Sequence, residues 1–306
     1  MTIKKTKGLI AAPFTGMDLN GKINVKNVSS YADHLKNIGL KGVFVAGTTG
    51  EGMLMTDTER LEVIEAWVSQ KSEDFRVIAH AGSTSISSAK LLASESARLG
   101  AEAIAIMGPP FLAPKGVNEL VEFSKDVALS APELPFYYYH IPALSGVDFP
   151  MSEYLNEAKS KIPNLAGIKF TDNNFMEMSK CISMDNGKWD ILHGYDELLL
   201  AGLSFGAVGA VGSTYNFMAP LYYGIIEDFT NGNIEKAREK QRKSIEVINI
   251  LIKYKGALVS GKAIMGLIGI DCGPCRKPLQ SLSSNEMKAF ENELKDCGFF
   301  EMVNSY

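Results

Sequence analysis

Short apolar runs alternate with amphipathic segments along most of the chain. Each run has the length of a buried strand, and the segment after it carries apolar residues at intervals of three and four, which is typical of a helix. The predicted strands cover residues 8–15, 42–47, 76–82, 103–108, 135–141, 165–171, 190–195 and 207–213. Eight strands, each followed by a helix within about 230 residues, predict an α/β protein of the (β/α)8 TIM-barrel type.

The predicted helices separate these strands, and one of them opens with the capping box formed by Thr56 and Glu59. They cover residues 25–38, 56–68, 86–99, 117–129, 152–159, 175–183, 197–205 and 218–229. After residue 231 the strands stop, and three more helices follow at 234–255, 259–267 and 284–295, the last with the capping box of Ser283 and Glu286. We therefore expect a barrel over residues 1–230 and a C-terminal helical extension over residues 231–306.

Composition narrows the class of protein. Hydrophobic residues make up 46% of the chain and charged residues 22%, as is ordinary for a soluble globular protein. The net charge of -4 argues against nucleic acid or an anionic membrane as the main partner. The basic start, residues 1–7, precedes an apolar run that continues into a turn-rich stretch, which favours a first strand over a signal peptide. We expect a cytoplasmic protein.

The cysteines indicate neither a disulfide scaffold nor a redox site. The chain has 4 cysteines, too few for a disulfide scaffold in a protein of 306 residues. Cys272 and Cys275 have the spacing of a thioredoxin-like motif, but they follow a helical segment near the C-terminus instead of a strand. We interpret this spacing as a coincidence.

The strand predicted over residues 165–171 contains a lysine. Alternation places Gly167, Lys169 and Thr171 on one face of this strand and Ala166, Ile168 and Phe170 on the other. A strand flanked by helices is buried on both faces, and burial lowers the pKa of a lysine by up to about 3–5 units. The alternative is a lysine that reaches water from the end of the strand or pairs with a carboxylate.

In barrels of this type the chemistry lies at the C-terminal ends of the strands. The polar residues predicted there are Thr48, Thr49, Glu51, Tyr139, His140, Lys169, Thr171, Gly194, Tyr195, Asp196, Glu197, Ser213 and Thr214. An inward lysine with a phenol on the neighbouring strand suits Schiff-base chemistry on a carbonyl substrate, because the imine withdraws electrons and the phenol can move protons.

Five segments at the ends of these strands resemble one family, the N-acetylneuraminate lyase and dihydrodipicolinate synthase group of class I aldolases. The resemblance runs from Gly8 to about Pro278. The segments are Gly47-Thr48-Thr49-Gly50-Glu51-Gly52, residues 137–146, Gly167-Ile168-Lys169-Phe170-Thr171, Gly194-Tyr195-Asp196-Glu197 and residues 211–216. Any one segment would be a weak match, but all five occur in order at strand ends, which makes the resemblance specific.

The resemblance implies a role for each of nine residues. It implies that Lys169 forms the Schiff base, that Tyr139 transfers protons, and that Thr48 and Thr49 hold the pyruvate carboxylate. The positions that match sugar contacts in the lyases are Thr171, Gly194, Asp196, Glu197 and Ser213. Turn hydrogen bonding is the alternative for the threonines and the serine, and stabilisation of a helix N-terminus is the alternative for the two acids.

Two positions favour the lyase branch of this family. The synthases carry an arginine where this chain has Leu144, and a tyrosine from a neighbouring subunit where it has Phe111. The resemblance therefore implies reversible cleavage of N-acetylneuraminate to N-acetylmannosamine and pyruvate. It also implies a homotetramer and chemistry without a metal or organic cofactor. The alternatives within the family are a dihydrodipicolinate synthase-like enzyme, a 2-keto-3-deoxy sugar acid aldolase and a non-catalytic sugar-acid binding protein.

Two alternatives lie outside this family. His80, His140 and His193 come from three predicted strands and would have to converge on zinc, but no metal-ligand spacing supports such a site. Glycines at positions 206, 209 and 212 suggest a phosphate site near the last two strands. No lysine or arginine lies among them, so a carboxylated or polyhydroxylated substrate fits better.

Overall fold

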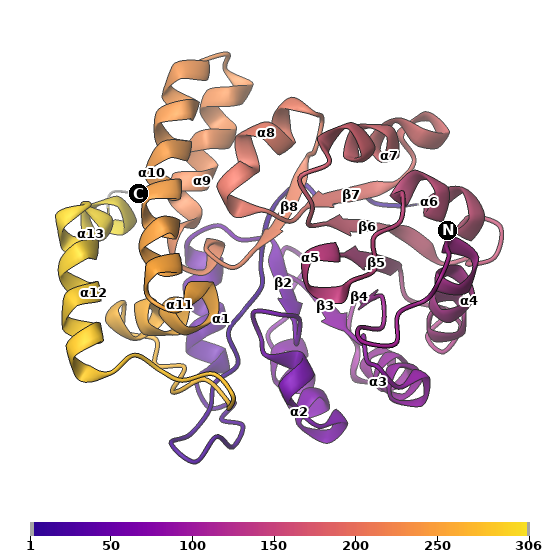
Figure 1. Ribbon diagram of the computed structural model, residues 1–306, viewed down its shortest axis with the longest axis horizontal. Helices are drawn as coiled ribbons and strands as arrows, with labels where there is room; N and C mark the ends of the chain where they lie inside the picture. Colours follow the sequence, from indigo (N-terminus) through magenta and orange to yellow (C-terminus); the bar gives the residue numbers. More distant parts are fainter. Residues whose placement is uncertain (1–2, 305–306) are drawn as a thin grey trace.

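A closed barrel of parallel strands forms the centre of the computed structural model, which describes residues 3–304 (Figure 1). The strands pair in sequence order, and β8 closes the barrel against β1. They are β1 (Gly8–Ala11), β2 (Gly42–Val45), β3 (Arg76–His80), β4 (Ala103–Met107), β5 (Phe136–His140), β6 (Leu165–Phe170), β7 (Asp190–His193) and β8 (Gly209–Gly212). The predicted barrel and all eight of its strands are confirmed.

The strands are shorter than predicted, mostly at their C-terminal ends. Residues 46–47 after β2 and 194–195 after β7 continue the apolar or extended pattern but leave the sheet. Their backbones turn instead into the loops that carry candidate site residues, as expected for the functional end of a barrel.

Helices cover the outside of the barrel, as the 3.6-residue periodicity predicted. They are α1 (Val28–Asn37), α2 (Asp57–Val68), α3 (Ile86–Leu99), α4 (Val117–Ala128), α5 (Pro142–Ser145), α6 (Met151–Ala158), α7 (Phe175–Gly187), α8 (Leu199–Ser204) and α9 (Tyr215–Thr230), with short 3-10 turns η1 (Gly52–Leu54) and η2 (Asp196–Leu198). Both predicted capping boxes are present, Thr56 with Glu59 and Ser283 with Glu286.

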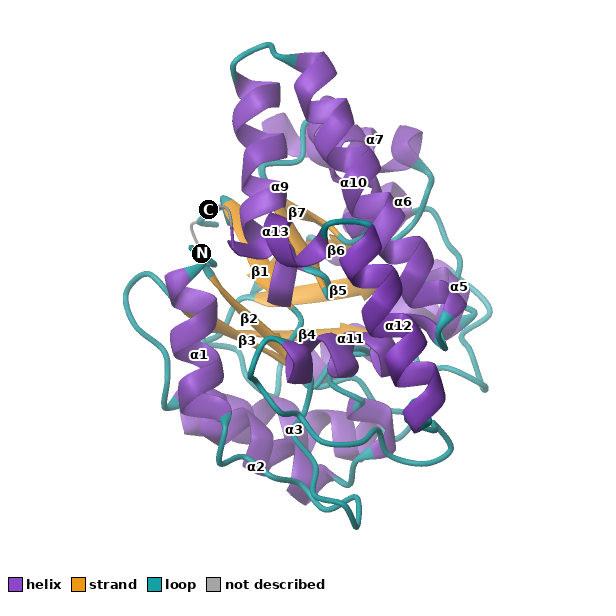
Figure 2. Cartoon of the chain, turned by 90° about the vertical axis from the view of Figure 1, so that its left-hand side faces the viewer, coloured by secondary structure: helices purple, strands orange, loops and turns teal. Residues whose placement is uncertain are grey.

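The C-terminal helices lie together on one side of the barrel (Figure 2). They are α10 (Ile234–Lys253), α11 (Gly256–Leu267), α12 (Ser284–Asp296) and α13 (Phe299–Asn304). Helix α10 packs along α9 and reaches η2 at the mouth of the barrel. Within residues 3–304, none of the helices combines the length and apolar character that crossing a membrane requires.

The helices differ from the prediction at several points. The short helices α5 and α13 were not predicted, because four and six residues carry too little periodicity to detect. The segment predicted as one helix over 197–205 is divided into η2 and α8, because Leu198 has φ -124° and interrupts the helical geometry. Helix α7 runs past its predicted end, with non-helical dihedrals at Met184, Asp185 and Asn186.

Side-chain alternation holds for most of β6 but fails at one residue. Ile168 and Phe170 pack outward against the helices, as predicted. Ala166, which we expected on that same face, packs instead with Tyr137 and Tyr139 in the barrel interior. The register between β5 and β6 shifts between Phe136 and Tyr137, and such a bulge locally reverses the alternation of the strand.

Candidate active site

A cavity of about 240 Å³ opens at the C-terminal ends of the strands. All nine residues proposed for the site from the sequence line it, although they come from β5, β6 and the loops after β2, β6, β7 and β8. They are Thr48, Thr49, Tyr139, Lys169, Thr171, Gly194, Asp196, Glu197 and Ser213. Tyr195 and Thr214, two of the other polar residues expected at these strand ends, line it as well.

Lys169 points from β6 into this cavity and is only 4% exposed. Its Nζ lies 4.3 Å from the ring centroid of Phe44 and 4.0 Å from that of Tyr139. Burial among these rings lowers the pKa of Lys169 to about 7, and the Asp196 carboxylate opposes part of that shift. The amine is therefore substantially unprotonated near neutral pH and is available as a nucleophile.

Tyr139 stands beside this lysine, because the β5–β6 register pairs Tyr139 with Lys169. Its hydroxyl lies 3.4 Å from the Thr48 hydroxyl. Burial raises the pKa of Tyr139 to about 12, while hydrogen bonding from Thr48 and Thr171 acts in the opposite direction. The phenol is thus neutral near pH 7, where its oxygen can accept a hydrogen bond from a reacting hydroxyl while its own proton is donated to another group.

Thr48 and Thr49 lie in the tight loop that follows β2. The Glu51 N–H donates to the Thr48 carbonyl at 3.0 Å, and the Thr15 hydroxyl donates to the Gly50 carbonyl at 2.6 Å. One hydrogen bond within the loop and one from Thr15 therefore restrain its backbone, while the Thr48 hydroxyl is directed toward Tyr139 and the cavity.

Asp196 is buried at the start of η2 and lines the same cavity. Its Oδ2 accepts from the Thr214 N–H at 2.6 Å and from the Thr214 hydroxyl at 2.7 Å. Burial raises the pKa of Asp196, and the Thr214 hydrogen bonds counteract that shift. Burial also raises the pKa of the neighbouring Glu197, and the Asp196 charge raises it further.

Two glycines make this arrangement sterically possible. A Cβ on Gly212 would lie 1.9 Å from the Asp196 Oδ1, and a Cβ on Gly194 would lie 1.9 Å from the Thr171 Oγ1. Both distances are far shorter than van der Waals contact, so a side chain at either position would displace a site residue.

The sequence did not indicate the apolar part of the cavity wall. Ile248 and Ile252 from α10, and Ala257 and Leu258 from α11, line the same cavity as Lys169. These residues look like ordinary apolar positions of amphipathic helices. The sequence held one indication of this wall. Helix α10 follows α9, the last barrel helix, after a connection too short for α10 to lie far from the barrel.

The three histidines do not converge on one point. His80 packs near Phe44 and Tyr139 with ring centroids 5.8 and 5.9 Å apart, His140 packs against Phe170, and His193 stacks on Phe175. Nowhere in residues 3–304 do three or more His, Cys, Asp or Glu side chains gather as metal ligands would.

Cys272 and Cys275 lie in the segment between α11 and α12, and both are buried free thiols. Burial raises the pKa of Cys272 to about 12 and that of Cys275 to about 11. Little thiolate is therefore present at neutral pH, which argues against redox chemistry at this pair.

Replacing Asp196 with asparagine should lower the pKa of Lys169 further, because the Asp196 charge raises it. The asparagine oxygen can still accept the Thr214 hydrogen bonds, so the loop should keep its position. The measurement is the rate of borohydride trapping of a keto acid on Lys169 against pH. We expect a midpoint near 7 in the unmodified protein and a lower midpoint in Asp196→Asn. An unchanged or higher midpoint would contradict this coupling.

A family model described as the dihydrodipicolinate synthetase family matches residues 5–297. N-acetylneuraminate lyase A of Xenopus laevis is 43% identical over 283 residues, which are 91% of this chain and 92% of that protein. The structure of Proteus mirabilis N-acetylneuraminate lyase superposes with a TM-score of 0.94 at 39% identity, over 97% of this chain and 100% of that one. A dihydrodipicolinate synthase structure from Cyanidioschyzon merolae gives a TM-score of 0.88 at 27% identity, over 96% and 99% of the two chains.

The closed barrel, with a buried lysine of lowered pKa beside a neutral phenol, suits an aldolase of the Schiff-base class, as the similar lyases are. The chain belongs to the dihydrodipicolinate synthetase family. The resemblance inferred from the five sequence segments is thereby confirmed.

Proposed function

We propose that this protein cleaves N-acetylneuraminate reversibly to N-acetylmannosamine and pyruvate. The single observation that carries the proposal is the buried Lys169, whose pKa is about 7, in one cavity with Tyr139 and the carboxylates of Asp196 and Glu197. The names and the high identity of the relatives support the choice of substrate. Leu144 and Phe111, which depart from the synthase pattern, support it as well.

The reaction begins when the neutral Lys169 amine attacks the keto carbon of the open-chain sugar acid. Loss of water from the carbinolamine gives an iminium, which draws electrons from the neighbouring carbon. The C4 hydroxyl then gives its proton to the Tyr139 oxygen while Tyr139 passes its own proton to the substrate carboxylate, and the C3–C4 bond breaks. N-acetylmannosamine leaves as the aldehyde, and the electron pair of the broken bond becomes an enamine. Protonation of the enamine and addition of water release pyruvate and restore the amine.

The two ends of the cavity take different roles. Thr48 and Thr49 hold the carboxylate of pyruvate or of the sugar acid through hydroxyl and backbone N–H groups. Thr171, Gly194, Asp196, Glu197 and Ser213 line the same cavity. We assign to them the binding of the sugar chain. Carboxylates are suitable acceptors for several sugar hydroxyls, and they would repel a second carboxylate or a phosphate. The lysine imine is the electron sink, so the chemistry needs no metal or organic cofactor.

We further propose a cytoplasmic homotetramer in which residues 1–230 form the barrel and residues 231–306 the helical extension. Phe111 and Leu112, in the loop after β4, are 95% and 83% exposed. Phe111 also has φ +74°, an unusual conformation for an exposed aromatic residue. Contact with a second subunit would remove this apolar pair from water.

The test is an assay with a panel of keto-sugar acids, combined with borohydride trapping of pyruvate. We expect cleavage of N-acetylneuraminate that survives EDTA, and one adduct that peptide mapping assigns to Lys169. Preferred cleavage of a 2-keto-3-deoxy sugar acid, or condensation of pyruvate with an amino-aldehyde, would shift the function within the family. Tight binding of sugar acids without turnover would identify a binding protein. An adduct on another lysine, or none, would overturn the mechanism.

A further inference from the structure

We propose that the C-terminal extension positions both substrate loops of the barrel through two separate buried contacts. Gln241 of α10 holds the sugar-side loop at Asp196, and Lys262 of α11 holds the pyruvate-side loop at Glu51. Both are positioning residues, because they act through the loops and not on the substrate. The inference rests on the proposed function for the identity of the two substrate ends.

The first contact joins α10 to the loop after β7. Gln241 is 7% exposed, and its side-chain amide is shared between three partners. Its Nε2 donates to the Asp196 carbonyl at 3.2 Å and to the Ser244 hydroxyl at 2.7 Å. Its Oε1 accepts from the Leu200 N–H, at the start of α8, at 2.9 Å. One side chain therefore binds the main chain on both sides of Glu197.

The second contact joins α11 to the loop after β2. Glu51 has φ +57°, a left-handed conformation that a non-glycine residue adopts only when its surroundings hold it. Its Oε1 lies 2.7 Å from Lys262 Nζ, and the two side chains are 0% and 3% exposed. Lys262 also donates to the Pro274 carbonyl at 2.8 Å, and the Arg276 N–H donates to Glu51 Oε2 at 2.7 Å. The carboxylate that follows Thr48 and Thr49 is thus held entirely by the extension.

Arg276 reinforces the second contact from the same segment. Its guanidinium binds Glu59 in bidentate fashion, at 2.7 and 2.6 Å, and also the Leu54 carbonyl at 2.9 Å. This pairing lowers the pKa of Glu59 to about 2. The chain from Glu51 into the first turn of α2 is therefore fixed to the C-terminal segment.

These contacts bear on catalysis because each holds a loop that carries substrate-binding residues. Gln241 binds the main chain on both sides of Glu197, and Lys262 binds the Glu51 side chain. A displacement of about 1 Å in a substrate-positioning group can cost about 10²-fold in rate. Asp196 reaches Thr214 on its own, so the loss of Gln241 leaves its carboxylate bound but frees the backbone that carries Glu197. The two contacts lie on different helices and reach different loops, the one after β7 and the one after β2, so they should affect different steps.

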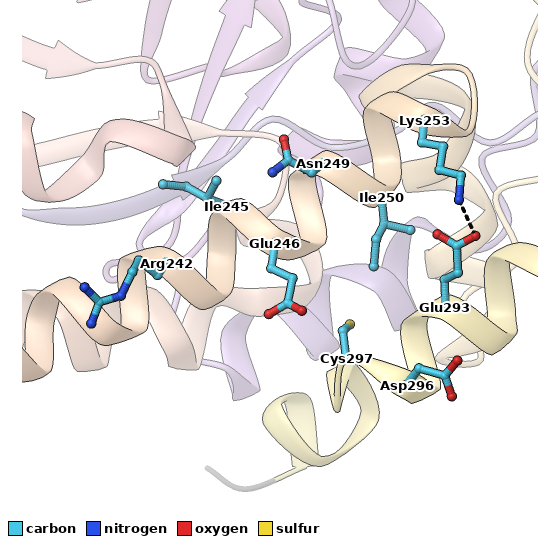
Figure 3. A pocket seen from close by; sticks show the side chains of 9 residues that line it. All are labelled: Arg242, Ile245, Glu246, Asn249, Ile250, Lys253, Glu293, Asp296 and Cys297. Atoms are coloured by element: carbon cyan, nitrogen blue, oxygen red, sulfur yellow. Dashed lines mark hydrogen bonds and ion pairs between the residues drawn. The ribbon is translucent and has the colours of Figure 1, made fainter.

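The experiment compares Gln241→Met with Lys262→Met, both of which remove polar groups while keeping a similar volume. The matched control is Asn249→Ala, another amide on α10. Figure 3 shows Asn249 beside a separate groove between α10 and α12, which Lys253 and Glu293 bridge at 2.6 Å. For each variant we would measure kcat and KM for N-acetylneuraminate, and the pyruvate concentration that gives half-maximal inactivation by borohydride.

Gln241→Met should raise the KM for N-acetylneuraminate about 10-fold, which corresponds to the loss of one hydrogen bond. It should leave unchanged the pyruvate concentration that gives half-maximal inactivation by borohydride. Lys262→Met should raise the pyruvate concentration needed for half-maximal inactivation about 10-fold. Lys262→Met leaves the Glu51 carboxylate buried without its cation, which can impair folding. Glu51→Gln therefore serves as a second variant, and it should also raise the pyruvate concentration needed for half-maximal inactivation. Asn249→Ala should change neither quantity.

Two results would overturn the proposal. One is an equal effect of Gln241→Met on the sugar and pyruvate measurements, which would indicate a general structural role. The other is unchanged kinetics in folded Gln241→Met and Glu51→Gln proteins. If the unmodified protein traps pyruvate but does not cleave N-acetylneuraminate, the proposed substrate fails. The comparison of variants is then made with the sugar acid that the protein does cleave.

Discussion

Lys169→Met should abolish pyruvate trapping and lower kcat by roughly 10⁴- to 10⁶-fold, as removal of a covalent nucleophile does in other enzymes. Methionine fills a similar volume between Phe44 and Tyr139, so the cavity should keep its shape. No other lysine lines the cavity, and within residues 3–304 no second amine stands where the substrate keto group would lie. The measurements are turnover of N-acetylneuraminate and the mass of the borohydride-treated protein.

The same variant should be more stable than the unmodified protein below neutral pH. The pKa of Lys169 falls from an ordinary value of 10.5 to about 7 on folding, so below pH 7 the folded protein carries a buried charge that the unfolded chain solvates. This penalty decreases as the pH rises from about 7 to 10.5. Lys169→Met should therefore raise the melting temperature at pH 6, and the gain should diminish at pH 9.

The exposed Lys90 provides the control for this experiment. Lys90→Met should change neither turnover nor the pH dependence of the melting temperature, because its amine is solvated in both states. A Lys169→Met protein that melts at a lower temperature at pH 6 would indicate that the lysine supports the fold, and residual trapping would place the nucleophile elsewhere.

The barrel was predictable because its signals are local and repeated. Each strand is a short apolar run and each major helix has a 3.6-residue period, so the eight units could be recognised one by one. Their ends were less predictable, because the residues after a strand keep its apolar character while the backbone leaves the sheet, as at residues 46–47. Ala166 shows a further limit: a one-residue bulge reverses alternation without any mark in the sequence.

The polar part of the site could be predicted because strand ends converge in a barrel. Residues as distant as Thr48 and Ser213 line one cavity, since each follows a strand of the same closed sheet. The contribution of the extension could not be predicted in the same way. Ile248 and Leu258 belong to helices outside the repeat, and their position over the barrel depends on tertiary packing. Gln241 likewise gives no sign, in a helix rich in polar residues, that it is buried.

Tyr139→Phe should lower kcat by about 10²- to 10⁴-fold, the usual contribution of a positioned proton-transfer group. The ring remains in place beside Lys169, so its contact with the amine and the burial that lowers the pKa of Lys169 should persist. Trapping of pyruvate should therefore continue, although more slowly if the phenol also assists loss of water from the carbinolamine. The measurement is single-turnover cleavage of N-acetylneuraminate alongside the rate of borohydride trapping.

The neighbouring Tyr137 is the matched control, since it lies two residues earlier on the same face of β5. Its hydroxyl donates to Asp190 Oδ2 at 2.9 Å at the opposite end of the barrel. Tyr137→Phe should reduce stability by about 0.5–1.5 kcal/mol, the net value of one hydrogen bond, and leave kcat unchanged.

A Tyr139→Phe protein with normal turnover would assign the proton transfer to another group. Equal losses of turnover in the two variants would mean that the phenols act through the packing of the barrel interior. The loss specific to Tyr139 follows from its position, because of the two phenols only Tyr139 lines the cavity that contains the amine.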